Sequence, residues 1–189
     1  LIGIPDRAIS LNGELGIAFG ARDSGNAAAH YEPKEVVINI TKTHGAGSLA
    51  HEWWHALDNY LSRAAGVKMG MVSDGSVNVR PEVKAAFDDL ISRIKESGYG
   101  RRSKKQGAYW RRPHEMTARL LAEWVDRELK RRGEANTFLS RGTNAERTLA
   151  FNYELYRAQM EAVKANPVPL EDFRRRTEAY EGFPYPTDA

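Results

Sequence analysis

A change in hydrophobic period near residue 48 constrains this chain more than any other feature. Before it, residues 15–20 (LGIAFG) and 35–41 (EVVINIT) are short runs typical of strands, and the second, nearly continuous in Val and Ile, predicts a strand covered on both faces. After it, apolar residues recur every three or four positions, as in amphipathic helices. Strands followed by helices predict an α+β fold, with a small N-terminal sheet and a helical majority.

The helical part is divided by residues that start or stop helices. Pro81 and Pro113 are suited to the first helical turn, and Gly98 to a C-terminal stop. Residues 99–109 (YGRRSKKQGAY) are polar and basic, so we expect an exposed loop there. The predicted helices span residues 48–63, 81–97, 113–133, 143–166 and 170–180, the fourth opened by a capping box of Thr143 and Glu146.

The composition limits the classes of protein to which the chain can belong. With 189 residues, of which 41% are hydrophobic and 28% charged, the chain suits one globular domain, which we place at 1–166, with a short helix and tail at 167–189. It has no cysteine, which excludes disulfide scaffolds, thiolate zinc sites, iron–sulfur clusters and cysteine nucleophiles. The chain begins with Leu1, and we expect it to be part of a longer protein.

Nothing in the sequence indicates a membrane segment. No apolar run approaches the roughly 18 residues that a membrane span needs, and the N-terminus lacks the pattern of an export signal. We therefore expect a soluble protein.

The motif His51-Glu52-Trp53-Trp54-His55 lies inside the helix predicted over 48–63. Two histidines four residues apart share one face of a helix, so both imidazoles can reach a single Zn²⁺ ion. Glu52 lies beside that face, where a carboxylate can take a proton from an attacking water and pass it to a leaving amine. The motif predicts zinc-dependent hydrolysis of a peptide bond, with Glu52 as the catalytic base.

A hydrolytic zinc site needs a third protein ligand and one open position. Glu115, in the first turn of the helix predicted from Pro113, is the candidate that we favour, with Arg119 one turn later as its ion-pair partner. Asp58 lies a further turn along the motif helix, where it is better placed to accept a hydrogen bond from a ligand imidazole than to bind metal. The other candidates for the third ligand are His30, His44, His114 and Glu123.

Two blocks of the chain carry a resemblance to a known family. Residues 19–61, together with Tyr109-Trp110 and residues 113–119 (PHEMTAR), resemble the large polyvalent-protein-associated domain, a zincin-like module of multidomain proteins from phages and conjugative elements. Over residues 1–130 the resemblance implies a zincin-like metallopeptidase fold of gluzincin type. It also implies the cytoplasm of a bacterial host as location, and the site residues His51, Glu52, His55 and Glu115.

The chain departs from the family pattern at two places. Ala122 stands where relatives carry a glutamate, with Glu123 beside it, and Trp54 stands where small residues are common in zincin motifs. The Trp54 ring is expected to narrow access to the site.

A donor for the oxyanion of the transition state is also expected near the site. Tyr109 and His44 are candidates, together with His30 and Tyr31, and spacing does not choose among them.

The charge distribution supports a second hypothesis. The net charge is +3, and basic residues gather between Arg101 and Arg112, around Trp110. Such a segment can bind nucleic acid, so the alternative is a zinc-containing accessory module that binds nucleic acid or a partner protein without hydrolysis. A third hypothesis is a former peptidase that serves as a scaffold. The presence of Glu52 argues against it, because a purely structural zinc does not need that residue.

Overall fold

A three-stranded sheet and a helical majority form the α+β fold that the sequence predicts. The structure is a computed structural model that describes residues 1–20, 28–41, 45–134 and 136–140. The helices predicted over 143–166 and 170–180, and the tail at 167–189, lie outside these residues. No helix of the described part is long and apolar enough to cross a membrane.

The sheet has the strand order β1-β3-β2, with β1 (Gly16–Phe19) parallel and β2 (Ala29–Glu32) antiparallel to the central β3 (Val37–Ile40). The prediction that the second run is a strand covered on both faces is confirmed, because consecutive residues Ile38, Asn39 and Ile40 are all buried. Strand β2 was not predicted, since only four residues form it and their hydrophobicity is mixed.

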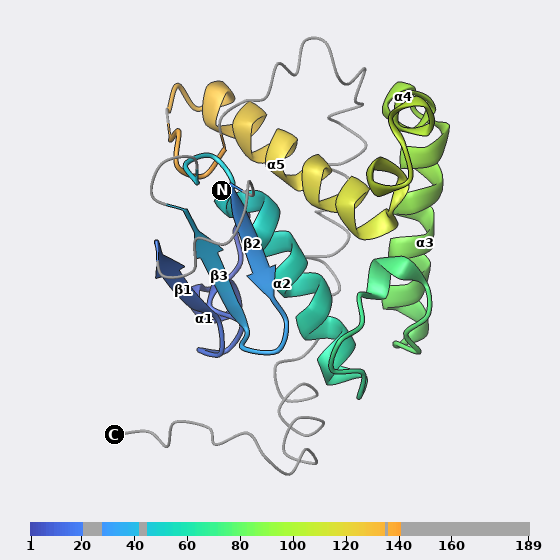
Figure 1. Cartoon of the computed structure of the whole chain (residues 1–189), viewed down its shortest axis with the longest axis horizontal. Helices are drawn as coiled ribbons and strands as arrows, with labels where there is room; N and C mark the ends of the chain where they lie inside the picture. Colours follow the sequence, from blue (N-terminus) through green and yellow to red (C-terminus); the bar gives the residue numbers. More distant parts are fainter. Residues whose placement is uncertain (21–27, 42–44, 135, 141–189) are drawn as a thin grey trace.

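Helix α2 (Leu49–Ala64) packs between the sheet and α5 (Pro113–Arg131), as Figure 1 shows. Its two tryptophans contact elements on opposite sides of the helix. Trp53 donates from Nε1 to the carbonyl of Ile9 at 2.8 Å, next to the sheet, whereas Trp54 donates to Thr117 of α5 at 2.8 Å. The Trp54 ring is buried in the core, and the expectation that it narrows access to the site stays a prediction.

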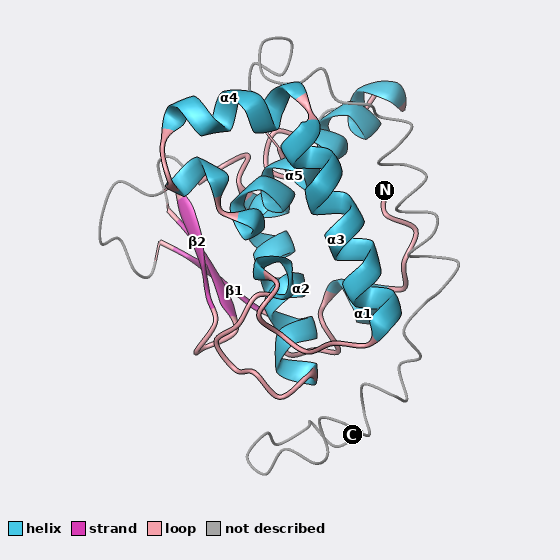
Figure 2. Ribbon diagram, turned by 90° about the vertical axis from the view of Figure 1, so that its right-hand side faces the viewer, coloured by secondary structure: helices cyan, strands magenta, loops and turns pink. Residues whose placement is uncertain are grey.

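Helices α3 and α4 lie on the side of α2 away from the sheet, whereas α1 lies beside the sheet (Figure 1; Figure 2 gives a second view). Pro81 and Pro113 open α3 and α5 as expected. The exposed loop predicted over 99–109 is wrong, because most of it forms α4. The other elements are α1 (Asp6–Ile9), η1 (Val72–Asp74), α3 (Pro81–Glu96), α4 (Gly98–Gln106) and η2 (Tyr109–Arg111).

Helix α4 forms despite its two glycines because its first turn is capped and anchored. The Ser97 hydroxyl accepts a hydrogen bond from the Gly100 N–H at 3.2 Å, which satisfies one of the free donors of the first turn. Tyr99 is buried, and the fully buried Ser103 hydroxyl donates to the Tyr99 carbonyl at 2.6 Å. These contacts outweigh the polar composition from which a loop was predicted.

Candidate metal centre

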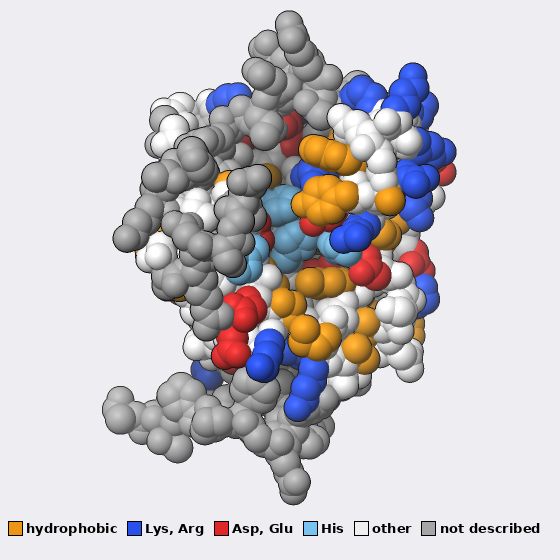
Figure 3. Space-filling view, viewed as in Figure 1, with side chains coloured by type: hydrophobic (Ala, Val, Ile, Leu, Met, Phe, Trp, Pro, Cys, Tyr) orange, Lys and Arg blue, Asp and Glu red, His pale blue; other side chains and the backbone are white. Residues whose placement is uncertain are grey.

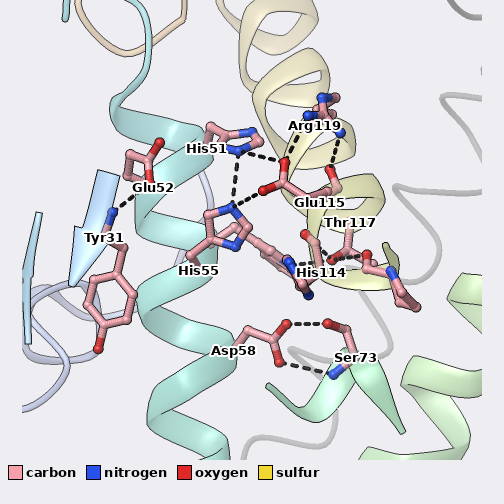
Figure 4. Close-up of polar contacts among 12 residues, drawn as sticks. Tyr31, His51, Glu52, His55, Asp58, Ser73, His114, Glu115, Thr117 and Arg119 are labelled. Atoms are coloured by element: carbon pink, nitrogen blue, oxygen red, sulfur yellow. Dashed lines mark hydrogen bonds and ion pairs between the residues drawn. The ribbon is translucent and has the colours of Figure 1, made fainter. Parts of the chain in front are cut away.

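Three side chains from two helices converge where α2 and α5 cross (Figure 4). The Nε2 atoms of His51 and His55, one turn apart on α2, are 3.1 Å from each other. From the first turn of α5, the carboxylate of Glu115 approaches both, with Oε2 at 3.6 Å from His51 Nε2 and Oε1 at 3.7 Å from His55 Nε2. Of the described residues, these three form the one group of His, Asp or Glu side chains that is close enough to hold a metal ion.

The distances between the two imidazole nitrogens and the nearer Glu115 oxygen of each are close to those around a tetrahedral metal ion. Zinc bonds of about 2.0–2.1 Å in tetrahedral geometry separate the ligand atoms by roughly 3.3–3.4 Å. The distances among the two imidazole nitrogens and the carboxylate oxygens lie on either side of this value, from 3.1 to 3.7 Å. Two imidazoles and a carboxylate are also a donor set that zinc accepts.

The protonation states of these groups favour metal binding. Burial opposes ionisation of Glu115, but the hydrogen bond with His51 and the charge of Arg119 outweigh it and bring the pKa to about 2. Burial, and next the neighbouring His51, lower the pKa of His55 to about 3. At neutral pH the site therefore presents a carboxylate and a neutral imidazole, the forms that bind metal.

Arg119 holds Glu115 in place, as predicted. Its Nη2 donates to Glu115 Oε2 at 2.8 Å, and its Nη1 donates to the Glu115 carbonyl at 3.2 Å. Since both bonds come from one guanidinium a turn further along α5, they fix the direction in which the carboxylate points.

Glu52 lies on the sheet side of the two histidines (Figure 4). Its Oε2 accepts a hydrogen bond from the backbone N–H of Tyr31 on β2 at 2.8 Å, and its Oε1 has no hydrogen-bond partner among the described residues. Burial raises the pKa of Glu52, and the nearby charge of His51 opposes that effect. One oxygen is thus held by the strand, and the other is available to a water or a substrate.

Two candidate oxyanion donors lie near the centre, Tyr109 beside Glu115 and His30 within electrostatic reach of Glu52. Burial, followed by the charge of the nearby Glu115, raises the pKa of Tyr109, so its phenol keeps its proton at neutral pH. The Tyr31 hydroxyl instead donates to Asn59 at 2.9 Å, and His30 contacts Asn39 at 3.3 Å. His44 lies outside the described residues.

Asp58 has a different partner from the one that the sequence suggested. Its Oδ1 accepts from the backbone N–H of Ser73 at 3.1 Å and its Oδ2 from the Ser73 hydroxyl, so both oxygens face η1 and not a ligand imidazole. His55 Nδ1 is buried without a hydrogen-bond partner among the described residues.

The remaining candidates for the third ligand bind elsewhere. Glu123 pairs with Arg127 at 2.7 Å. His114 contacts both oxygens of Asp74 through Nδ1, at 2.8 and 2.9 Å, while its ring lies edge-on to His55 with 5.7 Å between centroids. The hydrogen bond with Asp74 raises the pKa of His114. Asp74 was not identified from the sequence, because its partner His114 lies 40 residues away in the chain.

The histidines reach the surface in the middle of one face of the molecule (Figure 3). Hydrophobic and basic side chains adjoin them on one side, and acidic side chains lie close by. His51 is 18% exposed, so the centre is open to solvent on this face although His55 and Glu115 are buried.

The fold and the centre define an α+β protein with a preformed His–His–Glu cluster. The model of the family Large polyvalent protein-associated domain 1 matches residues 101–186. Over these residues the match confirms the resemblance to this family that the sequence predicted. No curated protein and no solved structure matches the chain.

The match differs in extent from the prediction. Residues 101–186 include Glu115 and the block 109–119, whereas the block 19–61, with both histidines, precedes them. The matched segment and the predicted range 1–130 thus share residues 101–130.

Proposed function

We propose that this domain is a zinc-dependent metallopeptidase of zincin-like, gluzincin-type fold. The observation that carries the proposal is the convergence of His51, His55 and Glu115 ligand atoms within 4.8 Å of one another, with the Glu52 carboxylate beside them. Glu52 is not part of the ligand group, and a zinc site that only stabilised a fold would not need it.

In the proposed peptide hydrolysis, the metal ligands and Glu52 have different roles. His51, His55 and Glu115 would hold the metal. Zinc in such a site supplies a Lewis acid that lowers the pKa of a water and polarises a substrate carbonyl. Glu52, fixed through Tyr31, takes the proton of the attacking water and passes it to the leaving amine.

Tyr109 is the proposed donor to the developing oxyanion. Its raised pKa keeps the hydroxyl proton in place, and the contact with Glu115 keeps the hydroxyl near the metal ligands. A neutral donor directed at the carbonyl oxygen stabilises the transition state more than the ground state.

The biological setting of the proposal follows from the family. The domain would be one part of a larger phage or mobile-element protein that acts on a protein or peptide in the cytoplasm of a bacterial host. The family name supports the association with polyvalent proteins, and the activity rests on the site.

The test distinguishes loss of the metal ion from loss of the catalytic base. In Glu52→Gln the zinc content should stay near one ion per chain while cleavage falls by at least about 100-fold, since general base catalysis contributes 10²–10⁴-fold. His51→Ala should lose both. Zinc is measured by elemental analysis, and cleavage by proteomic detection of new termini in a bacterial lysate. Wild-type cleavage that survives in Glu52→Gln, or loss of zinc from that variant, would contradict the roles assigned here.

A second candidate function is an accessory zinc module that binds nucleic acid or a partner without hydrolysis. The basic residues of α4 and η2 around the exposed Trp110 favour it. It predicts salt-sensitive association with DNA that Glu52→Gln leaves unchanged.

A further inference from the structure

Two exposed aromatic rings stand beside the metal centre on η2. Tyr109 is 47% and Trp110 36% exposed, and their rings meet edge-to-face at 82° with centroids 6.0 Å apart. The guanidinium of Arg119 lies 4.2 Å from the Trp110 centroid and 5.1 Å from that of Tyr109, and Arg112 lies 5.7 Å from Tyr109. We refer to Tyr109, Trp110, Arg111, Arg112 and Arg119 as the aromatic–arginine shelf.

Two exposed arginines of the shelf are accessible to a ligand, although Arg112 also stacks on Tyr109 and its charge acts on Asp74. Arg111 and Arg112 are exposed, and within the described residues neither forms an ion pair. The segment 98–112 contains six Arg or Lys residues and no Asp or Glu. The acids nearest to the shelf on adjoining elements are already engaged, Asp74 with His114 and Glu115 with Arg119.

The shelf is continuous with the metal centre. Arg119 contacts the Trp110 ring with one part of its side chain and Glu115 Oε2 with another, at 2.8 Å. The same guanidinium lies 5.1 Å from the centroid of the Tyr109 ring, and the charge of Glu115 acts on the Tyr109 hydroxyl. A chain bound across the centre on this side therefore lies against the shelf.

We propose that the aromatic–arginine shelf selects polypeptides that carry Asp or Glu side chains next to the bond at the metal centre. The guanidinium groups of Arg111 and Arg112 can form bidentate hydrogen bonds with carboxylates. The exposed rings cover the aliphatic parts of the bound chain. The assignment of acidic polypeptides as the substrate class rests on the proposed peptidase function for the cleavage step. Peptide binding can be measured without cleavage.

The stacking arrangement favours an acidic polypeptide over a nucleic acid. Bases bind to protein aromatic side chains by stacking on a free ring face. In the shelf, Arg119 lies over both rings and Arg112 also lies over Tyr109, so guanidinium groups already take ring faces that bases would need. The stacked guanidinium of Arg112 still points charge toward solvent, where a carboxylate can reach it.

The experiment measures binding to the zinc-loaded 189-residue chain carrying Glu52→Gln, so that no substrate is consumed. Fluorescence anisotropy compares a labelled Glu-rich peptide with peptides of the same length in which Gln or Lys replaces each Glu, and with a single-stranded oligothymidylate. The double variant Arg111→Ala/Arg112→Ala is compared with Lys34→Ala/Lys84→Ala, which removes the same charge from exposed positions on other elements. Circular dichroism checks that each variant is folded.

We expect the Glu-rich peptide to bind at least tenfold more tightly than the Gln peptide, and the shelf variant, but not the control variant, to lose that preference. Equal binding of the Glu and Gln peptides, or equal losses in the two double variants, would overturn the proposal. Tighter binding of the oligonucleotide, lost in the shelf variant, would also overturn it and assign the shelf to nucleic acid. Failure of the peptidase function appears separately, as a wild-type chain that binds the Glu-rich peptide without cleaving it.

Discussion

The Asp58 side chain is fully buried, and both of its oxygens accept hydrogen bonds from Ser73. Burial raises the pKa of Asp58 from 3.8 to about 6, although the two bonds from Ser73 oppose that shift. The folded chain therefore holds this proton at pH values where the unfolded chain has released it. From this group alone, stability falls as pH rises from about 4 to about 6, by about 3 kcal/mol in total.

Asp58→Asn should remove this pH dependence. The amide can accept from the Ser73 N–H and donate to the Ser73 hydroxyl, so the variant keeps the contacts without a charge. We expect its stability relative to wild type to increase between pH 4 and pH 7. Urea unfolding at a series of pH values, with a chelator present, measures the difference. Ser73→Ala should extend the wild-type decline to higher pH, and parallel curves for wild type and Asp58→Asn would contradict the assignment.

Glu115 is the ligand on which the proposed centre depends most, because it is the one contributed by α5. Glu115→Gln keeps the shape of the side chain and removes the negative charge. Since partners one step removed from a metal change affinity by about 10–100-fold, loss of this charge should weaken zinc binding by more than about 100-fold. Competition with a chromogenic chelator gives the affinity.

Glu123→Gln is the matched control for this change. Glu123 is a buried glutamate of the same helix that pairs with Arg127 instead of facing the histidines. Its zinc affinity should stay within about threefold of wild type. Equal affinities for the two variants would place the third ligand elsewhere.

At the scale of elements, α4 shows how close packing can reverse a helix preference. A Cβ on Gly100 would lie 2.4 Å from the carbonyl oxygens of Ile94 and Lys95, which are backbone atoms that cannot move aside cheaply. Gly100→Ala should therefore destabilise the chain by about 2 kcal/mol or more, although alanine in a helix is ordinarily better than glycine by about 1 kcal/mol.

Gly98→Ala provides the comparison within the same helix. Its new Cβ would meet the end of the flexible Arg102 side chain at 3.2 Å. We expect the unfolding free energy to change by less than about 1 kcal/mol, in either direction. Equal losses in the two variants would show that general glycine preference, and not the backbone contact, decides stability here.

The same helix explains why the sequence predicted other elements better than this one. The helices that begin at Pro81 and Pro113 have apolar faces and proline starts, and both were predicted within about two residues. The buried face of α4 consists of Tyr99, Gly100 and Ser103, which a hydrophobic pattern does not detect. Its stability comes from the cap at Ser97, the bond between Ser103 and Tyr99 and the burial of Tyr99, none of which depends on an apolar stripe.

The candidate site divides in the same way. The i, i+4 spacing of His51 and His55 sets their geometry once a helix forms, so their convergence was predictable. The partner of Asp58 depends on where η1 packs, and the Tyr31 N–H on where β2 lies relative to α2. Contacts between elements far apart in the chain leave no pattern in the local sequence, so neither was predicted.

At the scale of the whole molecule, the proposed metal would tie together the two helices that carry the core. Helix α2 contributes His51 and His55, and α5 contributes Glu115, so an ion bound to all three opposes separation of α2 from α5. A ligand that binds the folded state alone stabilises it by about 4 kcal/mol at 1,000 times its dissociation constant. For a chain of this size that corresponds to a rise in Tm of roughly 8–16 °C.

Thermal unfolding of chelator-treated protein, with and without zinc at that excess, should show this rise in wild type and in Glu52→Gln, because Glu52 does not bind the ion. His55→Asn should lose the rise. His30→Asn should keep it, since His30 lies on β2 against Asn39, and this control excludes general binding of zinc to histidines. If zinc raised the Tm of His55→Asn as much as that of wild type, stabilisation could not come from an ion shared by α2 and α5, and the proposed centre would lose its physical basis.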